Sequence, residues 1–152
     1  MSVEVAPPRS GPDRKRDTLA RLANDIDVWV STAGPDGVPY LVPLSFSWIA
    51  GGLLLATPEK SVTGRNLRAS GVAHLALGPT RDVVLVEGTV TAYSREEVPA
   101  ELAERFAREH WDARESKPPY GYFLVTPRRI RAWREENELT GREIMRDGEW
   151  LV

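Results

Sequence analysis

Short runs of β-branched and aromatic residues, separated by tight turn signals, constrain the fold more than any other feature of this sequence. DVWVSTA (27–33) is followed by GPDG and then by VPYLVPLSFSWI (38–49), and AGG separates this second run from LLLATP (53–58). Turns this short join antiparallel neighbours. The three runs therefore predict an antiparallel meander.

The rest of the chain continues this pattern with few helices. GVAHLALGP and DVVLVEGTVTAYS predict two more strands, with a bulge at Gly88, and YGYFLVTP and RRIRAWREE predict a final strand pair broken at Thr126–Pro127. Apolar residues at helical spacing predict short helices over 14–24, 61–70 and about 96–111. The sequence thus predicts a mainly β fold with short helices, in which six or seven antiparallel strands form a closed or nearly closed small barrel.

Length and composition predict one domain. The first 13 of the 152 residues contain PPRSGPD and no apolar periodicity, so we expect a flexible N-terminal tail at 1–13 and a single domain with a C-terminal extension at 14–152. No apolar run approaches the roughly 20 residues that cross a bilayer, and we expect a cytoplasmic protein that does not contact membranes.

The residue types present exclude several chemistries. The chain has no cysteine, which excludes disulfides, thiol nucleophiles and cysteine-ligated metals. His74 and His110 are its only histidines and predict no metal site, and neither lies near a nucleophile-elbow sequence. The net charge of -2 gives no global attraction for nucleic acid.

The segment TPEKSVTGRNL (57–67) combines hydroxyls, cations and a predicted helix start directly after a strand. Unpaired N–H groups at a helix N-terminus, with Lys60 and Arg65 beside them, suit an anion such as phosphate. Equally, Ser61 could simply cap a helix while the two cations remain solvated, and spacing alone leaves both interpretations open. The segment contains neither a Walker A nor a dinucleotide-binding glycine motif.

Four segments in order resemble the split β-barrel flavoproteins, the pyridoxamine 5′-phosphate oxidase-like superfamily that binds FMN or deazaflavin. They are VWVSTAGPDGVPYLVPLSF, TPEKSVTGRNL, RDVVLVEGTV and YFLVTPRRIRAW. Together they lie within about residues 18–135. The resemblance implies an antiparallel split β-barrel of six to seven strands that forms a homodimer, with the cofactor between the two subunits.

The resemblance also implies site residues. Those expected to flank the cofactor ring are Val42, Pro43, Leu44 and Ser45. Those expected to hold the ribityl phosphate are Thr57, Lys60, Ser61, Thr63, Arg65 and Asn66. Trp133 and Arg134, contributed by the partner subunit, would close the other side.

The implied activity is hydride transfer between the cofactor ring, FMN or the deazaflavin coenzyme F-420, and a small organic substrate, with Tyr40 or Ser45 as a nearby proton source. The C-terminal substrate motif of pyridoxamine phosphate oxidase is absent, and GREIMRDGEW stands in its place. Oxidation of that vitamin is therefore not expected. The alternative is a non-catalytic split barrel that binds or sequesters flavin or haem.

Overall fold

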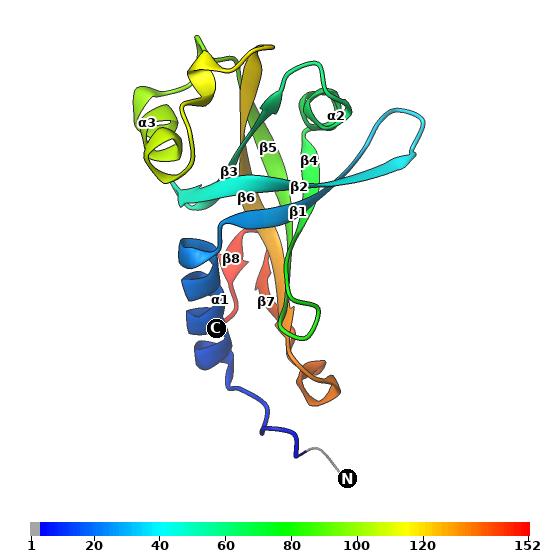
Figure 1. Cartoon of the computed structure of the whole chain (residues 1–152). Coiled ribbons are helices and arrows are strands. Elements are labelled where there is room, and N and C mark those ends of the chain that lie inside the picture. Colours follow the sequence, from blue (N-terminus) through cyan, green and yellow to red (C-terminus); the bar gives the residue numbers. More distant parts are fainter. Residues whose placement is uncertain (1–3) are drawn as a thin grey trace.

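The computed structural model describes residues 4–152, in which eight antiparallel strands form one sheet (Figure 1). The strand order is β3-β2-β1-β4-β5-β6-β7-β8, and β3 also pairs with β6. This extra pairing closes the first six strands into a barrel, while β7 and β8 extend the sheet beyond it. The predicted mainly β barrel is confirmed.

The strands and helices have the following bounds. The strands are β1 (Asp27–Ala33), β2 (Pro39–Ile49), β3 (Gly52–Pro58), β4 (Val72–Leu77), β5 (Val83–Tyr93), β6 (Tyr120–Trp133), β7 (Glu143–Arg146) and β8 (Glu149–Trp150). The helices are α1 (Gly11–Asn24), α2 (Val62–Ser70) and α3 (Ala100–Glu109), with 3-10 turns η1 (Ala113–Glu115) and η2 (Glu136–Glu138).

Two tight hairpin turns have the backbone that their sequences predict. Ala50 and Gly51, between β2 and β3, have φ of 56° and 70°, and Asp147 and Gly148, between β7 and β8, have φ of 52° and 79°. Two consecutive positive φ values define the turn whose twist matches that of paired strands. These turns fix the register of both hairpins.

The prediction of a strand pair broken at Thr126–Pro127 is wrong, because β6 runs through that dipeptide as one strand of 14 residues. The strand pair contains a bulge instead of a break. Glu87 pairs with Arg129 and Gly88 with Pro127, which leaves Arg128 as one extra residue on β6. A Cβ on Gly88 would lie 2.6 Å from the carbonyl oxygen of Thr126. The predicted bulge at Gly88 is confirmed, and it lets β6 accommodate its proline.

Helix α1 begins at Gly11, three residues before the predicted start at Arg14. The hydroxyl of Ser10 accepts a hydrogen bond from the Asp13 amide at 3.2 Å, and Pro12 lies in the first turn. Serine caps and early prolines are ordinary helix-start signals. Residues 1–3, part of the predicted tail, lie outside the described residues.

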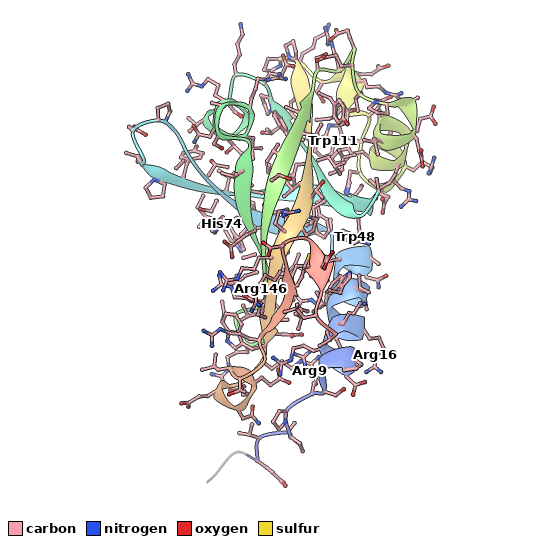
Figure 2. All side chains as sticks on the ribbon, turned by 180° about the vertical axis from the view of Figure 1, so that it is seen from behind. Arg9, Arg16, Trp48, His74, Trp111 and Arg146 are labelled. Atoms are coloured by element: carbon pink, nitrogen blue, oxygen red, sulfur yellow. The ribbon has the colours of Figure 1, made fainter. Side chains whose placement is uncertain are left out.

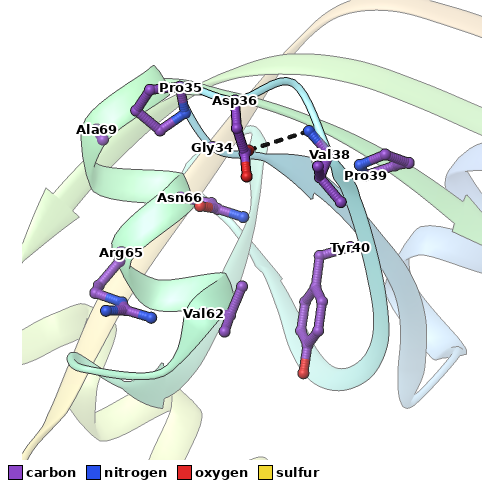
Figure 3. Close-up of a pocket in the computed structure, with 10 residues that line it drawn as sticks. All are labelled: Gly34, Pro35, Asp36, Val38, Pro39, Tyr40, Val62, Arg65, Asn66 and Ala69. Atoms are coloured by element: carbon purple, nitrogen blue, oxygen red, sulfur yellow. Dashed lines mark hydrogen bonds between the residues drawn. The ribbon is translucent and has the colours of Figure 1, made fainter.

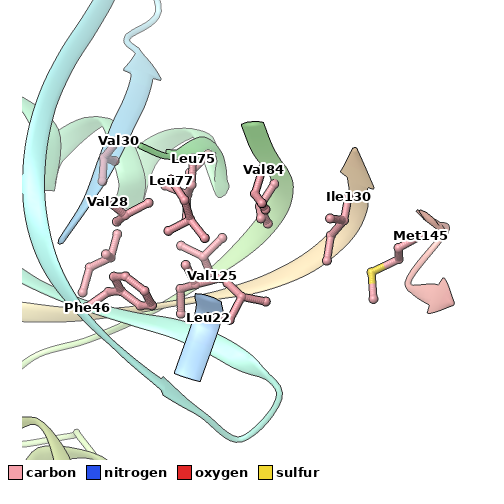
Figure 4. Close-up of a cluster of buried hydrophobic side chains, with 14 of the residues drawn as sticks. Leu22, Val28, Val30, Phe46, Leu75, Leu77, Val84, Val125, Ile130 and Met145 are labelled. Atoms are coloured by element: carbon pink, nitrogen blue, oxygen red, sulfur yellow. The ribbon is translucent and has the colours of Figure 1, made fainter. Parts of the chain in front are cut away.

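The core occupies the barrel interior and a second layer under α3. Interior side chains from all six barrel strands, among them Val30, Phe46, Leu75 and Val125, are at most 2% exposed (Figure 4). On the opposite side of the barrel from α2, α3 covers the outside of β3 and β6 with Phe106 and its neighbours (Figure 1). Burial of these apolar surfaces provides the main stabilisation of the fold.

A buried ion pair ties the segment before α1 to the far end of β6. Both carboxylate oxygens of Glu138 accept hydrogen bonds from the Arg9 guanidinium, at 2.8 and 2.9 Å, and the amides of Arg9 and Arg134 donate to the same carboxylate at 2.8 Å. The Glu138 side chain is 4% exposed. These hydrogen bonds, above all from the Arg9 side chain, lower the pKa of Glu138 from 4.5 to about 2.

This lowered pKa predicts acid sensitivity. The stabilisation by Glu138 is fully present above about pH 4.5 and is lost as pH falls through about 2. Between pH 7 and pH 3 we expect the wild type to lose about 2 kcal/mol of unfolding free energy that the Glu138→Gln variant does not lose. Urea unfolding of both proteins at the two pH values measures this difference, and equal acid losses would contradict the prediction.

Candidate functional site

The segment predicted to bind an anion, residues 57–67, covers the end of β3, a short loop at 59–61 and the first turns of α2. Ser61 caps α2, accepting a hydrogen bond from the Gly64 amide at 3.0 Å and donating its own hydroxyl proton to the Pro58 carbonyl at 2.7 Å. The hydroxyl of Thr57 lies 3.5 Å from that of Ser61. The predicted capping role of Ser61 is confirmed, and the loop is folded tightly back against the helix start.

Gly64 makes this tight packing possible. A Cβ at this position would lie 2.4 Å from the Pro58 carbonyl oxygen and 2.9 Å from that of Glu59. Although alanine normally favours a helix over glycine, here it would push the backbone of the loop away. The sequence shows Gly64 only as an unfavourable helix residue, so its role becomes visible only in the packed structure.

We therefore expect Gly64→Ala to destabilise the protein by about 1–3 kcal/mol, against the usual helix preference. A matched control is Gly78→Ala, because nothing lies within 4 Å of a Cβ built there. Thermal unfolding followed by circular dichroism should show a melting temperature several degrees lower for the first variant only. A raised melting temperature for Gly64→Ala would contradict this packing.

A groove of about 520 Å³ lies between α2 and the loop that joins β1 to β2 (Figure 3). This hairpin projects beyond the barrel beside α2 (Figure 1). The lining residues are Gly34, Pro35, Asp36, Val38, Pro39, Tyr40, Val62, Arg65, Asn66 and Ala69. The groove therefore combines apolar walls with a few polar groups, as ligand pockets usually do.

Arg65 and Lys60 are free to meet an anion. Both side chains are exposed, and neither forms a salt bridge or side-chain hydrogen bond with any residue of the described range 4–152. By contrast, the carboxylate of Asp36 across the groove already accepts the Val38 amide at 3.1 Å. Arg65 is thus the groove's available cation, next to the open N–H groups at the start of α2.

Three other residues expected to hold phosphate are buried. Thr57, Thr63 and Asn66 are 5%, 2% and 9% exposed. The side-chain amide of Asn66 donates to the hydroxyl of Thr32 on β1, at 3.2 Å. Of the six predicted phosphate residues, the structure thus brings Arg65 and Asn66 to the groove wall, and Ser61 and Lys60 lie in the adjoining loop.

The residues expected to flank the ring lie along β2. Val42 and Leu44 are half-buried and alternate with Pro43, which points to the outer face and lines a second groove at the junction of α1 and β1. The hydroxyl of Ser45 donates to the Asp27 carboxylate at 2.9 Å. None of these four residues lines the groove beside Arg65.

Trp133 and Arg134 lie at the opposite end of β6 from this loop. The start of β6 pairs with the end of β3, where Tyr120 faces Pro58, whereas Trp133 ends the same strand. The Arg134 guanidinium contacts Asp82 at 3.3 Å and Asp17 at 3.6 Å. Within one protomer these residues are therefore not brought to the groove, and their predicted role requires a second subunit.

The outer face of β2, β1 and β4 exposes large apolar side chains. Leu41 is 60% exposed, Trp29 46% and Val72 52%. The adjoining strands carry charged side chains: Glu87 on β5 lies 3.6 Å from Arg131 on β6. His74 on β4 (Figure 2) lies 3.5 Å from Glu87. In the β1–β2 pairing Leu41 faces Ser31 and Trp29 faces Pro43, so exposed apolar side chains from both strands lie on this face. Large exposed apolar groups are common at protein–protein contacts.

The part of the chain that the structure describes contains no cluster of three or more histidine or acidic residues that could hold a metal ion. Among the same residues, no helix is long and apolar enough to span a bilayer.

Comparisons with solved structures show many similar folds, while no curated protein matches significantly. A conserved hypothetical protein from Mycobacterium tuberculosis, Rv2991, has 18% identity and a TM-score of 0.65, over 90% of this chain and 92% of that one. The haem storage protein HutZ from Vibrio cholerae has 9% identity and a TM-score of 0.68, over 90% of this chain and 99% of that one. An F420 reductase has 18% identity and a TM-score of 0.56, over 73% of this chain and 93% of that one.

The family model described as pyridoxamine 5′-phosphate oxidase matches residues 18–134. This range contains all six barrel strands in full, together with α2, α3 and the groove. By this match and by its closed six-strand barrel, the chain belongs to the pyridoxamine 5′-phosphate oxidase family.

Proposed function

We propose that this protein is a homodimeric oxidoreductase that binds FMN or the deazaflavin coenzyme F-420 and transfers hydride to or from a small organic substrate. The observation that carries the proposal is the groove beside α2, whose cation Arg65 has no partner within residues 4–152. Membership of the family supports a redox cofactor, and a fold similar to that of an F420 reductase is consistent with it.

The groove residues fit such a cofactor in charge and in shape. The planar guanidinium of Arg65 suits two oxygens of a phosphate, and Lys60 adds charge at the adjoining loop. Tyr40 and Val62 offer apolar surface on opposite walls (Figure 3). A bound flavin or deazaflavin would itself supply the hydride chemistry, so the protein needs only to bind it, orient it and limit its access to water.

Of the two expected proton sources, the structure favours Tyr40. The Tyr40 side chain lines the groove, and the residue is 42% exposed. The Ser45 hydroxyl already donates to Asp27 at 2.9 Å. A proton delivered at the groove would therefore come from the Tyr40 hydroxyl or from solvent.

The outer face of the sheet supports the proposed homodimer. Leu41 and Trp29 would be covered by the same face of a second copy, since a two-fold contact pairs a surface with itself. Val38 and Leu41 lie on the projecting hairpin, with 61% and 60% exposure, so this arm would reach the partner. A second copy would also supply the Trp133 and Arg134 that lie far from the groove in one protomer.

A second candidate function is a non-catalytic barrel that sequesters flavin or haem. One neighbouring structure is a haem storage protein, and another is a haem binding protein from Mycobacterium smegmatis. His74, which is exposed on β4, is the histidine that would meet haem at the outer face. Its Nε2 lies 3.5 Å from Glu87, however, so Nδ1 is the ring nitrogen without this carboxylate contact.

An absorption spectrum of the purified protein, before and after titration with FMN, F-420 and haem, tests these alternatives. We expect a band characteristic of bound flavin or deazaflavin, and its loss on addition of a reduced nicotinamide would support oxidoreductase activity. A haem band, with no flavin or deazaflavin binding, would contradict the main proposal and favour the second. Binding without turnover of any donor or acceptor would favour sequestration.

A further inference from the structure

Asn66 connects one wall of the groove, α2, to β1, the strand that leads into the loop of the opposite wall. It lies on α2, and its side-chain Nδ2 donates to the hydroxyl of Thr32 on β1, at 3.2 Å. Both residues are buried, with exposures of 9% and 5%. Asn66 lines the groove and Thr32 does not. A buried side-chain hydrogen bond of this kind stabilises one arrangement of the elements it joins.

The hairpin loop also rests on Asn66. A Cβ on Gly34 would lie 3.1 Å from the Asn66 Oδ1, so the loop backbone passes close to this side chain. The loop is held internally by the bonds from Gly37 to the Gly34 carbonyl at 2.9 Å and from Val38 to Asp36 at 3.1 Å. These two bonds stabilise the shape of the loop, and Asn66 is the α2 side chain that the Gly34 backbone approaches.

We propose that Asn66 is a positioning residue that fixes the β1–β2 hairpin against α2 and so sets the width of the groove. This assignment differs from the role implied by family resemblance, in which Asn66 holds phosphate directly. One of the two N–H donors of its NH₂ group bonds to Thr32, and its effect on a ligand is exerted through the opposite wall, which carries Val38 and Tyr40. The consequence for cofactor binding rests on the proposed function; the effect on the hairpin does not.

Thr32→Val separates the two roles, because it removes the acceptor while Asn66 stays in the groove. Without cofactor, we expect hydrogen exchange of residues 34–41 to become about tenfold faster in Thr32→Val and in Asn66→Ala. Thr32→Ser keeps the hydroxyl acceptor, so its residues 34–41 should exchange at the wild-type rate. Cofactor affinity should fall by about tenfold in Thr32→Val and in Asn66→Ala, and no further in the variant that combines them, because both remove the same interaction.

Val86→Ala is the stability control, since this residue is 1% exposed in the barrel interior. It should lower the melting temperature without accelerating exchange in 34–41 and without changing cofactor affinity. Unchanged exchange in Thr32→Val would overturn the positioning role. Weaker cofactor binding in Asn66→Ala but not in Thr32→Val would also overturn it and assign Asn66 to direct contact. Faster exchange in a protein that binds neither cofactor would support the role of Asn66 and refute only the proposed function.

Discussion

Replacing Arg65 by alanine should weaken the binding of FMN or F-420 by about 100-fold, which corresponds to the loss of one or two charge-assisted hydrogen bonds. The unliganded protein should unfold at nearly the wild-type temperature, because the exposed guanidinium has no partner within the described range 4–152. Isothermal titration with each cofactor, together with thermal unfolding, measures both quantities.

Two controls make the Arg65 result interpretable. Arg65→Lys keeps the charge but loses the planar fork, so we expect an intermediate loss of affinity. Arg108→Ala removes an equivalent charge from α3, where Arg108 also forms no salt bridge inside the described part of the chain, and it should leave affinity unchanged. An equal loss of affinity in Arg65→Ala and Arg108→Ala would indicate a general charge effect and contradict a specific site.

Leu41→Asp should convert the proposed dimer into a monomer. A two-fold interface would place this carboxylate twice in an apolar contact, with a cost of several kcal/mol and an association weakened by about a thousandfold. Light scattering coupled to size-exclusion chromatography should show half the wild-type mass. Cofactor affinity should fall as well, if the partner's Trp133 and Arg134 contribute to the site.

The matched control for the dimer is Leu151→Asp, since Leu151 is 48% exposed and follows β8, the strand that ends the sheet on the side opposite to β2 and β1 in the strand order. This variant should keep the wild-type mass. A wild type that is monomeric at micromolar concentration would contradict the homodimer, and with it the predicted contact of Trp133 with the cofactor.

Local sequence was enough to predict most of the strands and their turns. Ala50–Gly51 and Asp147–Gly148 occur between apolar runs, and their positive φ values are a property of two or three residues. The continuity of β6 was missed because a proline within a strand ordinarily ends it. The bulge that admits Pro127 depends on Gly88, which lies far away in the sequence on β5.

Only half of the candidate site was visible in the sequence. Ser61 and Arg65 belong to one short segment, and their capping and charge are local properties. For the opposite wall, residues 34–40, the sequence predicts a turn and the start of a strand but not their approach to α2, which joins segments far apart in the chain. The closure of the barrel by β3 and β6 is equally non-local. The sequence has no periodicity that encodes such contacts.

The central claim is that the groove between the β1–β2 hairpin and α2 holds the anionic tail of a redox cofactor. Crystals grown with FMN and with F-420 test it most directly. The account predicts a phosphate within hydrogen-bonding distance of Arg65 and the first amides of α2, with the ring near a two-fold axis. A cofactor bound elsewhere, with Arg65 facing solvent, would contradict it.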